Sequence, residues 1–191
     1  MGREFELKYA ATAQVHRSLL DTYGPFRAIA METTYFDTVD GALSARRITL
    51  RLRKENQLTL CTLKTPLKKG TGEWECQATD IHQGIAQLLA LGAPAEIGHL
   101  TAPGLVPVCG ARFTRMAALL PTADGQVELA LDSGVLLGGG KELPLCELEL
   151  ELKSGSDEAT EALAAQMAGQ YHLRPERKSK FRRALALAKG E

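Results

Sequence analysis

The sequence predicts a mainly β protein with flanking helices (α+β), in which about eight strands form a closed antiparallel β-barrel. Short segments alternate polar with apolar residues, which is the two-residue period of a strand. Most of these segments are joined by short turns such as Glu55-Asn56. Apolar residues make up 45% of the 191 residues, enough for the core of one domain covering 1–191. We expect the sheet to close because closure removes exposed strand edges.

The strands follow from this alternation in chain order. The cleanest is residues 145–153, where glutamate and leucine alternate, and the weakest is residues 108–119. The expected strands cover residues 4–9, 28–37, 48–54, 58–65, 73–79, 108–119, 126–137 and 145–153.

The helices are predicted from helical spacing and from capping residues. Residues 12–23 carry apolar side chains at helical spacing after a possible N-cap at Thr12, and Gly24-Pro25 ends this helix. Residues 156–170 begin at the capping residue Ser156 and carry acids in the first turn. Further helices are expected at residues 82–91 and, as a short helix or strand, at 179–189; residues 66–72 and 93–107 are expected to be loops.

Charge and hydropathy exclude several classes of protein. The chain has 23 Lys plus Arg and 23 Asp plus Glu, so its net charge is zero and we expect no nucleic-acid partner. No apolar run reaches the ~18 residues that a membrane helix needs. The N-terminus has no apolar signal core, so we expect no membrane partner. The default expectation is a soluble cytoplasmic protein, either a monomer or a homodimer.

The polar faces of the expected strands are charged rather than merely polar. Two arrangements fit this pattern: the charged faces point to solvent from a sandwich or ordinary barrel, or they line a wet lumen whose apolar outer faces are covered by helices. Alternation alone does not choose between them, and the first is commoner in proteins generally. The charged residues are Glu4, Glu6, Lys8, Arg51, Arg53, Lys64, Glu73, Glu75, Glu128, Asp132, Glu147, Glu149 and Glu151.

The order of the charges favours a charged lumen. Glu147, Glu149 and Glu151 share one face of one strand, each ~7 Å from the next, so they repel one another and call for a compensating cation. Arg51 and Arg53 repeat the arrangement with positive charge. Carboxylates bind Mg²⁺ or Mn²⁺, and Arg and Lys bind phosphate oxygens. A complex of metal and polyphosphate needs both sets together.

At these residues the chain resembles a known family. Glu4-Phe5-Glu6-Leu7-Lys8 resembles the ExExK signature of CYTH domains, the triphosphate tunnel metalloenzymes. Residues 146–155 followed by a helix most resemble the bacterial inorganic triphosphatase branch. The resemblance continues in order through Tyr35-Phe36-Asp37, Leu50-Arg51-Leu52-Arg53, Lys64, Glu73, Glu75, Glu128, Asp132, Cys146 to Glu151, and Ser179-Lys180.

The resemblance implies an eight-stranded tunnel with a charged lumen and a specific set of site residues. The expected metal ligands are Glu4, Glu6, Glu149 and Glu151, with Glu147 on the same face and Asp132 near the metals. The expected phosphate-binding residues are Lys8, Arg51, Arg53, Lys64, Arg115 and Lys180, where Arg115 is preferred to Arg112. Among all these residues the catalytic set is Glu4, Glu6, Lys8 and Asp132, and the expected cofactor is Mg²⁺ or Mn²⁺.

The chain also departs from the family pattern in three places. On the sixth strand, where the family usually has one or two basic residues, only Arg112 and Arg115 are available, and they have opposite parity. Glu73 stands where the family often has an arginine. Many members of this branch carry a second domain rich in histidine, whereas this sequence has four histidines and ends at Glu191, so we expect that domain to be absent or to have been removed.

The resemblance implies hydrolysis of the terminal phosphoanhydride bond of inorganic triphosphate or a related triphosphate, with triphosphate or polyphosphate as the small-molecule partner. One alternative keeps the fold but changes the reaction, to that of a class IV-type adenylate cyclase or a thiamine triphosphatase. Another is a polyphosphate-binding module without turnover. The complete acidic set argues against that module, because phosphate binding alone needs only bases.

Overall fold

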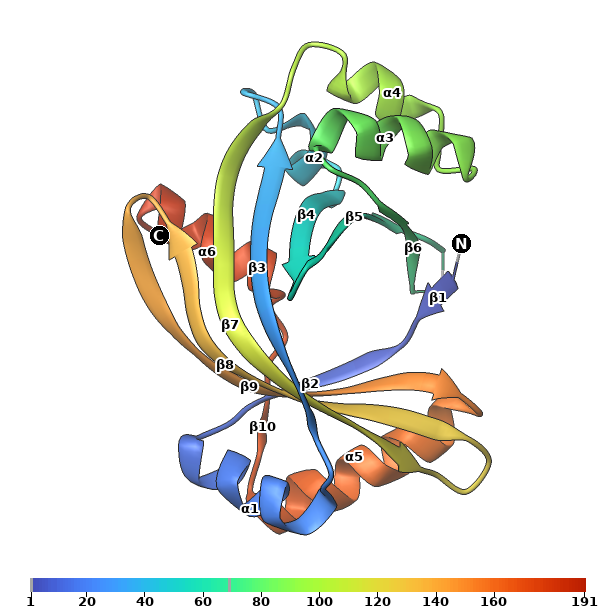
Figure 1. Ribbon diagram of the computed structural model, residues 1–191, viewed down its shortest axis with the longest axis vertical. Coiled ribbons are helices and arrows are strands. Elements are labelled where there is room, and N and C mark those ends of the chain that lie inside the picture. Colours follow the sequence, from blue (N-terminus) through green and yellow to red (C-terminus); the bar gives the residue numbers. More distant parts are fainter. Residues whose placement is uncertain (1, 69) are drawn as a thin grey trace.

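The computed structural model describes residues 2–68 and 70–191, and the side chains from Phe5 onward. One antiparallel sheet curls around a central space, with most of the helices on its outside (Figure 1). A mainly β fold with flanking helices is thereby confirmed. The strands are β1 (Gly2–Glu4), β2 (Glu6–Ala10), β3 (Arg27–Asp37), β4 (Thr49–Glu55), β5 (Leu58–Pro66), β6 (Thr71–Gln77), β7 (Val106–Pro121), β8 (Gln126–Gly138), β9 (Lys141–Ser154) and β10 (Arg174–Pro175).

The sheet differs from the expected closed barrel of eight strands. Over the described residues it has ten strands in the order β1-β6-β5-β4-β3-β7-β8-β9-β2-β10, and its two end strands do not pair with each other. The physical reason lies at Phe5, where the expected first strand divides. Its first half, β1, pairs with β6, and its second half, β2, pairs with β9. One short segment of chain therefore connects the two ends of the sheet covalently, an outcome that alternation cannot reveal.

The helices fall mainly where the sequence places them. Thr12 and Ser156 accept backbone hydrogen bonds as N-caps, and residues 180–189 form a helix rather than a strand. A short helix, α4, interrupts the expected loop at 93–107. None of the described helices has the length and apolar character needed to cross a membrane. The helices are α1 (Ala13–Tyr23), α2 (Ala42–Ala45), α3 (Ile81–Ala90), α4 (Glu96–Thr101), α5 (Asp157–Tyr171) and α6 (Lys180–Lys189).

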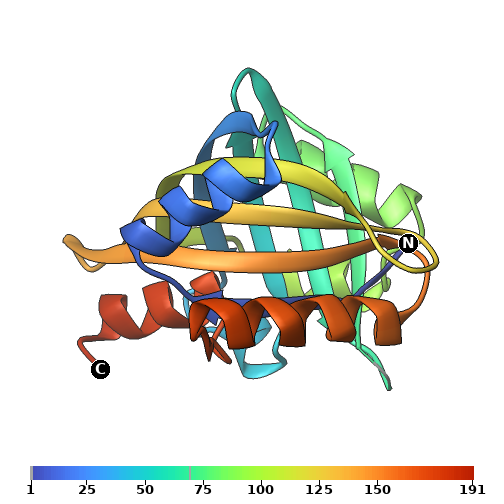
Figure 2. The same ribbon diagram turned by 90° about the horizontal axis from the view of Figure 1, so that it is seen from below.

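The apolar faces of most strands point outward to α1, α3, α4 and α5, whereas α6 lies against the inner face of β7, β8 and β9. Leu129, Leu131, Leu148 and Leu150 are at most 1% exposed and belong to a core cluster with residues of α1 and α5. Figure 2 shows both helices lying along the outside of β7, β8 and β9. A second cluster joins Trp74 and its neighbours on β4–β6 to α3 and α4. The charged faces therefore point inward, and of the two arrangements the one with a charged interior is present.

The helix α6 lies against β7 and β8, where a glycine permits close approach. A Cβ atom added to Gly138 would lie 2.4 Å from the carbonyl oxygen of Ala184 and 2.7 Å from the amide nitrogen of Ala188. Both of these atoms are backbone, so they cannot move aside as a flexible side chain would. Close packing of α6 on the sheet thus depends on the missing side chain at Gly138.

We expect Gly138→Ala to lower the unfolding free energy by about 1–3 kcal/mol, because α6 must shift away from β8. The matched control is Gly169→Ala in α5, where an added Cβ meets no atom within 4 Å. That control should be neutral or stabilising by up to about 1 kcal/mol, since alanine favours helix. Urea unfolding of both variants measures the difference, and equal stabilities would contradict this packing.

Candidate active site

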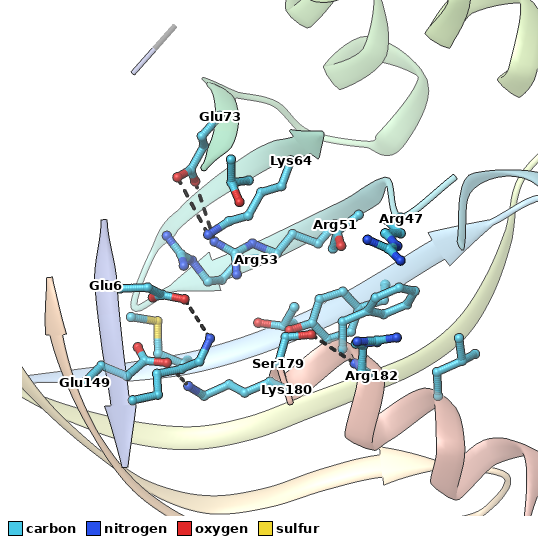
Figure 3. Close-up of a pocket in the computed structure, with 18 of the residues that line it drawn as sticks. Glu6, Arg47, Arg51, Arg53, Lys64, Glu73, Glu149, Ser179, Lys180 and Arg182 are labelled. Carbon is cyan, nitrogen blue, oxygen red and sulfur yellow. Dashed lines mark hydrogen bonds and ion pairs between the residues drawn. The ribbon is translucent and has the colours of Figure 1, made fainter. Parts of the chain in front are cut away.

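The inner face of the sheet and one side of α6 enclose a cavity of about 1280 Å³. Most of the predicted site residues line it, as Figure 3 shows for several of them. Asp132 and Glu147 are buried behind this lining, and the side chain of Glu4 lies outside the described residues. The predicted residues on the cavity wall are Glu6, Lys8, Arg51, Arg53, Lys64, Arg115, Glu149, Glu151 and Lys180.

One wall of the cavity is basic. Arg51 and Arg53 point inward from β4, at alternate positions to the outward Leu50. Arg53 contacts Glu55 at 2.5 Å and Glu75 at 3.5 Å. Burial, and then the neighbouring charge of Arg51, lower the pKa of the Arg53 guanidinium. Crowded guanidinium groups of this kind favour an anion between them.

Glu73 contributes a negative charge to the basic wall. Its carboxylate lies 3.7 Å from the Nζ atom of Lys64 and 4.0 Å from a guanidinium nitrogen of Arg51. Where the family often has an arginine, this chain therefore has an acid that lies between two bases on neighbouring strands.

The opposite wall presents carboxylates in a row across three strands. In the β-ladders Glu6 pairs with Glu151, and Glu151 pairs with Glu128. Their side chains keep 18–30% exposure and line the cavity. Lys8 lies 2.7 Å from Glu6, and Lys153 lies 2.8 Å from Glu151 and 3.7 Å from Glu128. We call Glu6, Glu128 and Glu151 the acidic row.

Beneath this row lies a buried ion network. Carboxylate oxygens of Asp132, Glu147 and Glu149 lie within 4.8 Å of one another. Arg115 donates two hydrogen bonds of 2.7 Å to Asp132 and one of 2.5 Å to Glu149. The ammonium group of Lys180 contacts all three acids, at 2.7 Å from Asp132 and 2.8 Å from Glu149.

Arg183 completes the network by pairing with Glu147. Three carboxylates are thus matched by three cations, which is the condition for burying such charges without a large penalty. A metal ion that used all three carboxylates would have to displace the ammonium group of Lys180.

The network fixes the charge of its members. Burial lowers the pKa of Lys180, but the charges of Glu149, Asp132 and Glu147 outweigh it, so the pKa is raised and the ammonium group stays charged. Burial raises the pKa of Glu149, yet Lys180, Arg115 and Lys8 hold it well below its usual value. For Glu147, burial is the stronger influence and its pKa is raised. Glu149, which also lines the cavity, is therefore ionised near neutral pH.

A family model described as the CYTH domain matches residues 2–185. This chain belongs to the CYTH family. The inorganic triphosphatase of Haemophilus influenzae is 31% identical over 167 residues, covering 82% of this chain and 47% of that protein. The CYTH domain described here therefore spans about half the length of this curated relative.

Solved structures of other proteins show the same fold. A candidate adenylyl cyclase from Hippeastrum, described as having a dominant triphosphatase activity, aligns with a TM-score of 0.65 and 20% identity. The alignment covers 98% of this chain and 95% of that one. A candidate adenylate cyclase from Bacillus halodurans aligns with a TM-score of 0.64 and 20% identity, over 94% of this chain and 96% of that one. At this identity the likeness shows the fold alone.

The donor groups of this CYTH domain fit a hard divalent cation. The acidic row and Glu149 offer carboxylate oxygens to the cavity, and oxygen ligands are what Mg²⁺ and Mn²⁺ prefer. Glu128 was not among the site residues expected from the sequence, although it shares the inward face of its strand with Asp132. Its pairing with Glu151 across the ladder brings it into the row.

Other cavity residues were also missed. Glu55 and Lys153 continue the inward faces of β4 and β9, so alternation provides a signal for both. Arg47 precedes β4 with a left-handed backbone (φ 59°), and Arg182 lies on α6, so strand alternation gives no signal for either. Arg115 lines the cavity, whereas Arg112 is exposed and pairs with Glu142 at 3.2 Å.

We expect Asp132→Asn to lower the unfolding free energy by about 3–5 kcal/mol, because it leaves Arg115 and Lys180 buried with one carboxylate fewer. The matched control is Glu142→Gln, which removes one partner of the exposed pair with Arg112 and should cost less than about 1 kcal/mol. Thermal and urea unfolding give both values. Similar small losses in the two variants would show that the buried network contributes little to stability.

Proposed function

We propose that this CYTH domain hydrolyses the terminal phosphoanhydride bond of inorganic triphosphate, or of a related triphosphate, with Mg²⁺ or Mn²⁺. The observation that carries the proposal is the placement of an acidic row and a basic wall around one cavity. The inorganic triphosphatase of Haemophilus influenzae supports it at 31% identity. The part of that relative which matches this chain is about half of its length.

The ligands proposed for the metal are the acidic row (Glu6, Glu128 and Glu151) and Glu149, with Glu4 expected to join them. A bound divalent ion would neutralise phosphate charge and lower the pKa of an attacking water. Asp132 and Glu147, also predicted as ligands, pair with Lys180 in this structure. We assign these two acids mainly to holding that ammonium group in place.

The bases of the chain bind and orient the phosphates. Three bases on one wall would bind phosphate oxygens: Arg51, Arg53 and Lys64. Three more would bind them from the opposite side of the cavity: Lys8, Arg115 and Lys180. The two nitrogen–oxygen contacts between Arg115 and Asp132 hold the guanidinium in a fixed orientation before substrate arrives. Such fixed positive charges stabilise the negative charge that moves onto the leaving pyrophosphate.

The alternative reactions find less support in the cavity. A cyclase or thiamine triphosphatase needs a surface for an aromatic ring, but the lining residues Tyr35, Phe113 and Phe181 are only 3–8% exposed. A binding module without turnover would not need the acidic row. Inorganic triphosphate therefore matches the described lining better than a nucleotide does.

A phosphate-release assay with inorganic triphosphate, ATP and thiamine triphosphate, each with Mg²⁺ and Mn²⁺, tests the proposed function. We expect the highest kcat/KM for triphosphate and no release when a chelator removes the metal. Preference for ATP or thiamine triphosphate would favour the alternative reactions. Binding of triphosphate without release under any condition would favour the binding module.

We expect Glu6→Gln and Arg53→Ala both to lose activity, and to differ in whether excess Mn²⁺ restores it. Glu6→Gln keeps the shape but removes a charge from the proposed metal site, so activity falls and excess Mn²⁺ restores part of it. Arg53→Ala removes a phosphate contact, so activity falls by roughly 10²-fold and excess Mn²⁺ does not restore it. Titration of Mn²⁺ against phosphate release compares the two.

The controls for this comparison are Glu142→Gln and Arg112→Ala, the exposed pair outside the cavity lining. Both should keep the rate of the unaltered chain. Rescue of Arg53→Ala but not of Glu6→Gln would mean that the two roles are reversed.

Metal and substrate should also stabilise the folded chain. Lys8 and Lys153 offset part of the charge of the acidic row, and its three carboxylates still repel one another. A ligand that binds only the folded state adds stability by mass action. A ligand concentration of about 100 times Kd raises the free energy of unfolding by about 2.7 kcal/mol. We therefore expect a higher Tm with Mn²⁺ and triphosphate, and an unchanged Tm would contradict the assignment of the cavity as their site.

A further inference from the structure

Two cysteines lie opposite each other on neighbouring strands, outside the cavity. Cys61 on β5 and Cys76 on β6 are direct partners in the antiparallel ladder. All four cysteines of the chain are free thiols. The other two, Cys109 and Cys146, are paired in their ladders with residues other than cysteine. The sheet therefore brings Cys61 and Cys76 together and keeps the remaining two thiols apart from them.

The spacing of the two strands at this pair suits a disulfide. The amide nitrogen of Ala78 donates a hydrogen bond of 3.1 Å to the carbonyl oxygen of Thr59, two residues along each strand from the cysteines. Because hydrogen-bonded pairs recur at every second position of an antiparallel ladder, Cys61 and Cys76 also form such a pair. The Cα atoms of a hydrogen-bonded pair are ~5.5 Å apart, within the ~4.4–6.8 Å that a disulfide spans.

Both sulfur atoms lie beneath one residue of α3, the helix that packs on β5 and β6 (Figure 1). The Cys76 thiol donates a hydrogen bond of 3.6 Å to the carbonyl oxygen of Gly84. A Cβ atom added to Gly84 would lie 2.4 Å from the sulfur of Cys61. Two thiols that contact the same glycine from neighbouring strands are close in space as well as paired in register.

The two cysteines differ in their access to solvent. Cys61 is 0% exposed, whereas Cys76 is partly exposed. Burial, and then the neighbouring thiol of Cys76, raise the pKa of Cys61 to about 12. Burial also raises the pKa of Cys76. Cys76 is therefore the thiol that a small oxidant reaches first, and both thiols react faster in alkaline solution, where more thiolate is present.

The opposite face of β5 and β6 belongs to the basic wall. Next to the cysteines, the Thr62 hydroxyl donates a hydrogen bond of 2.8 Å to the carboxylate of Glu75, which lies 3.5 Å from Arg53. The other neighbour of β6 is β1, a strand of three residues at the end of the sheet. A covalent bond between β5 and β6 would therefore hold the strands of this wall together near the end of the sheet.

We propose that Cys61 and Cys76 form a redox-active pair, which hydrogen peroxide oxidises to a disulfide that ties β5 to β6. The thiolate of Cys76 attacks one peroxide oxygen, the O–O bond breaks, and Cys76 becomes a sulfenic acid as the first water leaves. The thiolate of Cys61 then attacks the sulfur of Cys76, the S–S bond forms, and the hydroxyl group leaves as the second water. Two thiols lose two electrons, the peroxide gains them, and the two thiol protons end in the two waters.

The pair does not depend on the proposed function. Both thiols lie on the outer face of the sheet under α3, and their oxidation is measured without metal or phosphate. The disulfide would close a loop of about 15 residues between Cys61 and Cys76. Closing a loop of that length restricts the unfolded chain and so stabilises the folded one.

The test treats the unaltered chain with hydrogen peroxide at about pH 8.5 and then counts free thiols in denaturant. We expect the count to fall from four to two, and peptide mapping without reduction to show Cys61 joined to Cys76. The test variants are Cys61→Ala and Cys76→Ala, which should form no such linkage. The matched control is Cys109→Ala with Cys146→Ala, which keeps the pair and should lose both of its remaining thiols.

We expect the oxidised unaltered chain to have a Tm roughly 5–10 °C above that of the same chain after reduction. This comparison needs no substitution, so it remains informative where a change at the buried Cys61 impairs folding. Peroxide treatment should change the Tm of Cys76→Ala by less than about 2 °C.

Three results would overturn the pair. They are a thiol count that stays at four in the unaltered chain, a linkage that involves Cys109, Cys146 or a second copy of the chain, and an oxidised chain whose Tm is no higher than that of the reduced chain. Phosphate release from triphosphate is measured separately. If triphosphate is not hydrolysed, the proposed function fails, while the thiol count and the linkage still decide the pair.

Discussion

The interior of the protein depends on the ion pairs between the ammonium group of Lys180 and three buried carboxylates. A sheet with its apolar faces turned outward must place its charged faces inside, where an unmatched charge is costly. Lys180, together with Arg115 and Arg183, matches the charges of Asp132, Glu147 and Glu149. The inward charges are therefore compatible with a stable fold.

The same interaction connects the fold to the proposed chemistry. Lys180 belongs to α6, so its ion pairs dock the helix on the sheet and also close one side of the cavity. The close approach of Gly138 to Ala184 and Ala188 also holds α6 against the sheet, nearer the C-terminal end of the helix. The ion network neutralises itself, while the acidic row above it and the basic wall opposite both face the cavity, where a cation and an anion can reach them.

The alternation of charge and leucine was enough to predict most of the strands and which side chains share a face. That Arg51 and Arg53 share one face follows from the parity of their strand, whereas the inward direction of that face was favoured by the order of the charges. Three features could not be predicted. The division at Phe5 depends on which edges β1 and β2 find, the depth of Asp132 depends on how α6 covers it, and Arg47 and Arg182 lie outside any regular strand.

Direct measurement of Mn²⁺ binding by electron paramagnetic resonance, with triphosphate present, tests the central claim that the acidic row holds the metal next to the phosphates. The comparison is between the unaltered chain, Glu151→Gln in the row and Glu142→Gln outside it. We expect tight Mn²⁺ binding in the unaltered chain and in Glu142→Gln, and a loss of Mn²⁺ affinity of roughly tenfold or more in Glu151→Gln. Equal Mn²⁺ affinity in all three would contradict it.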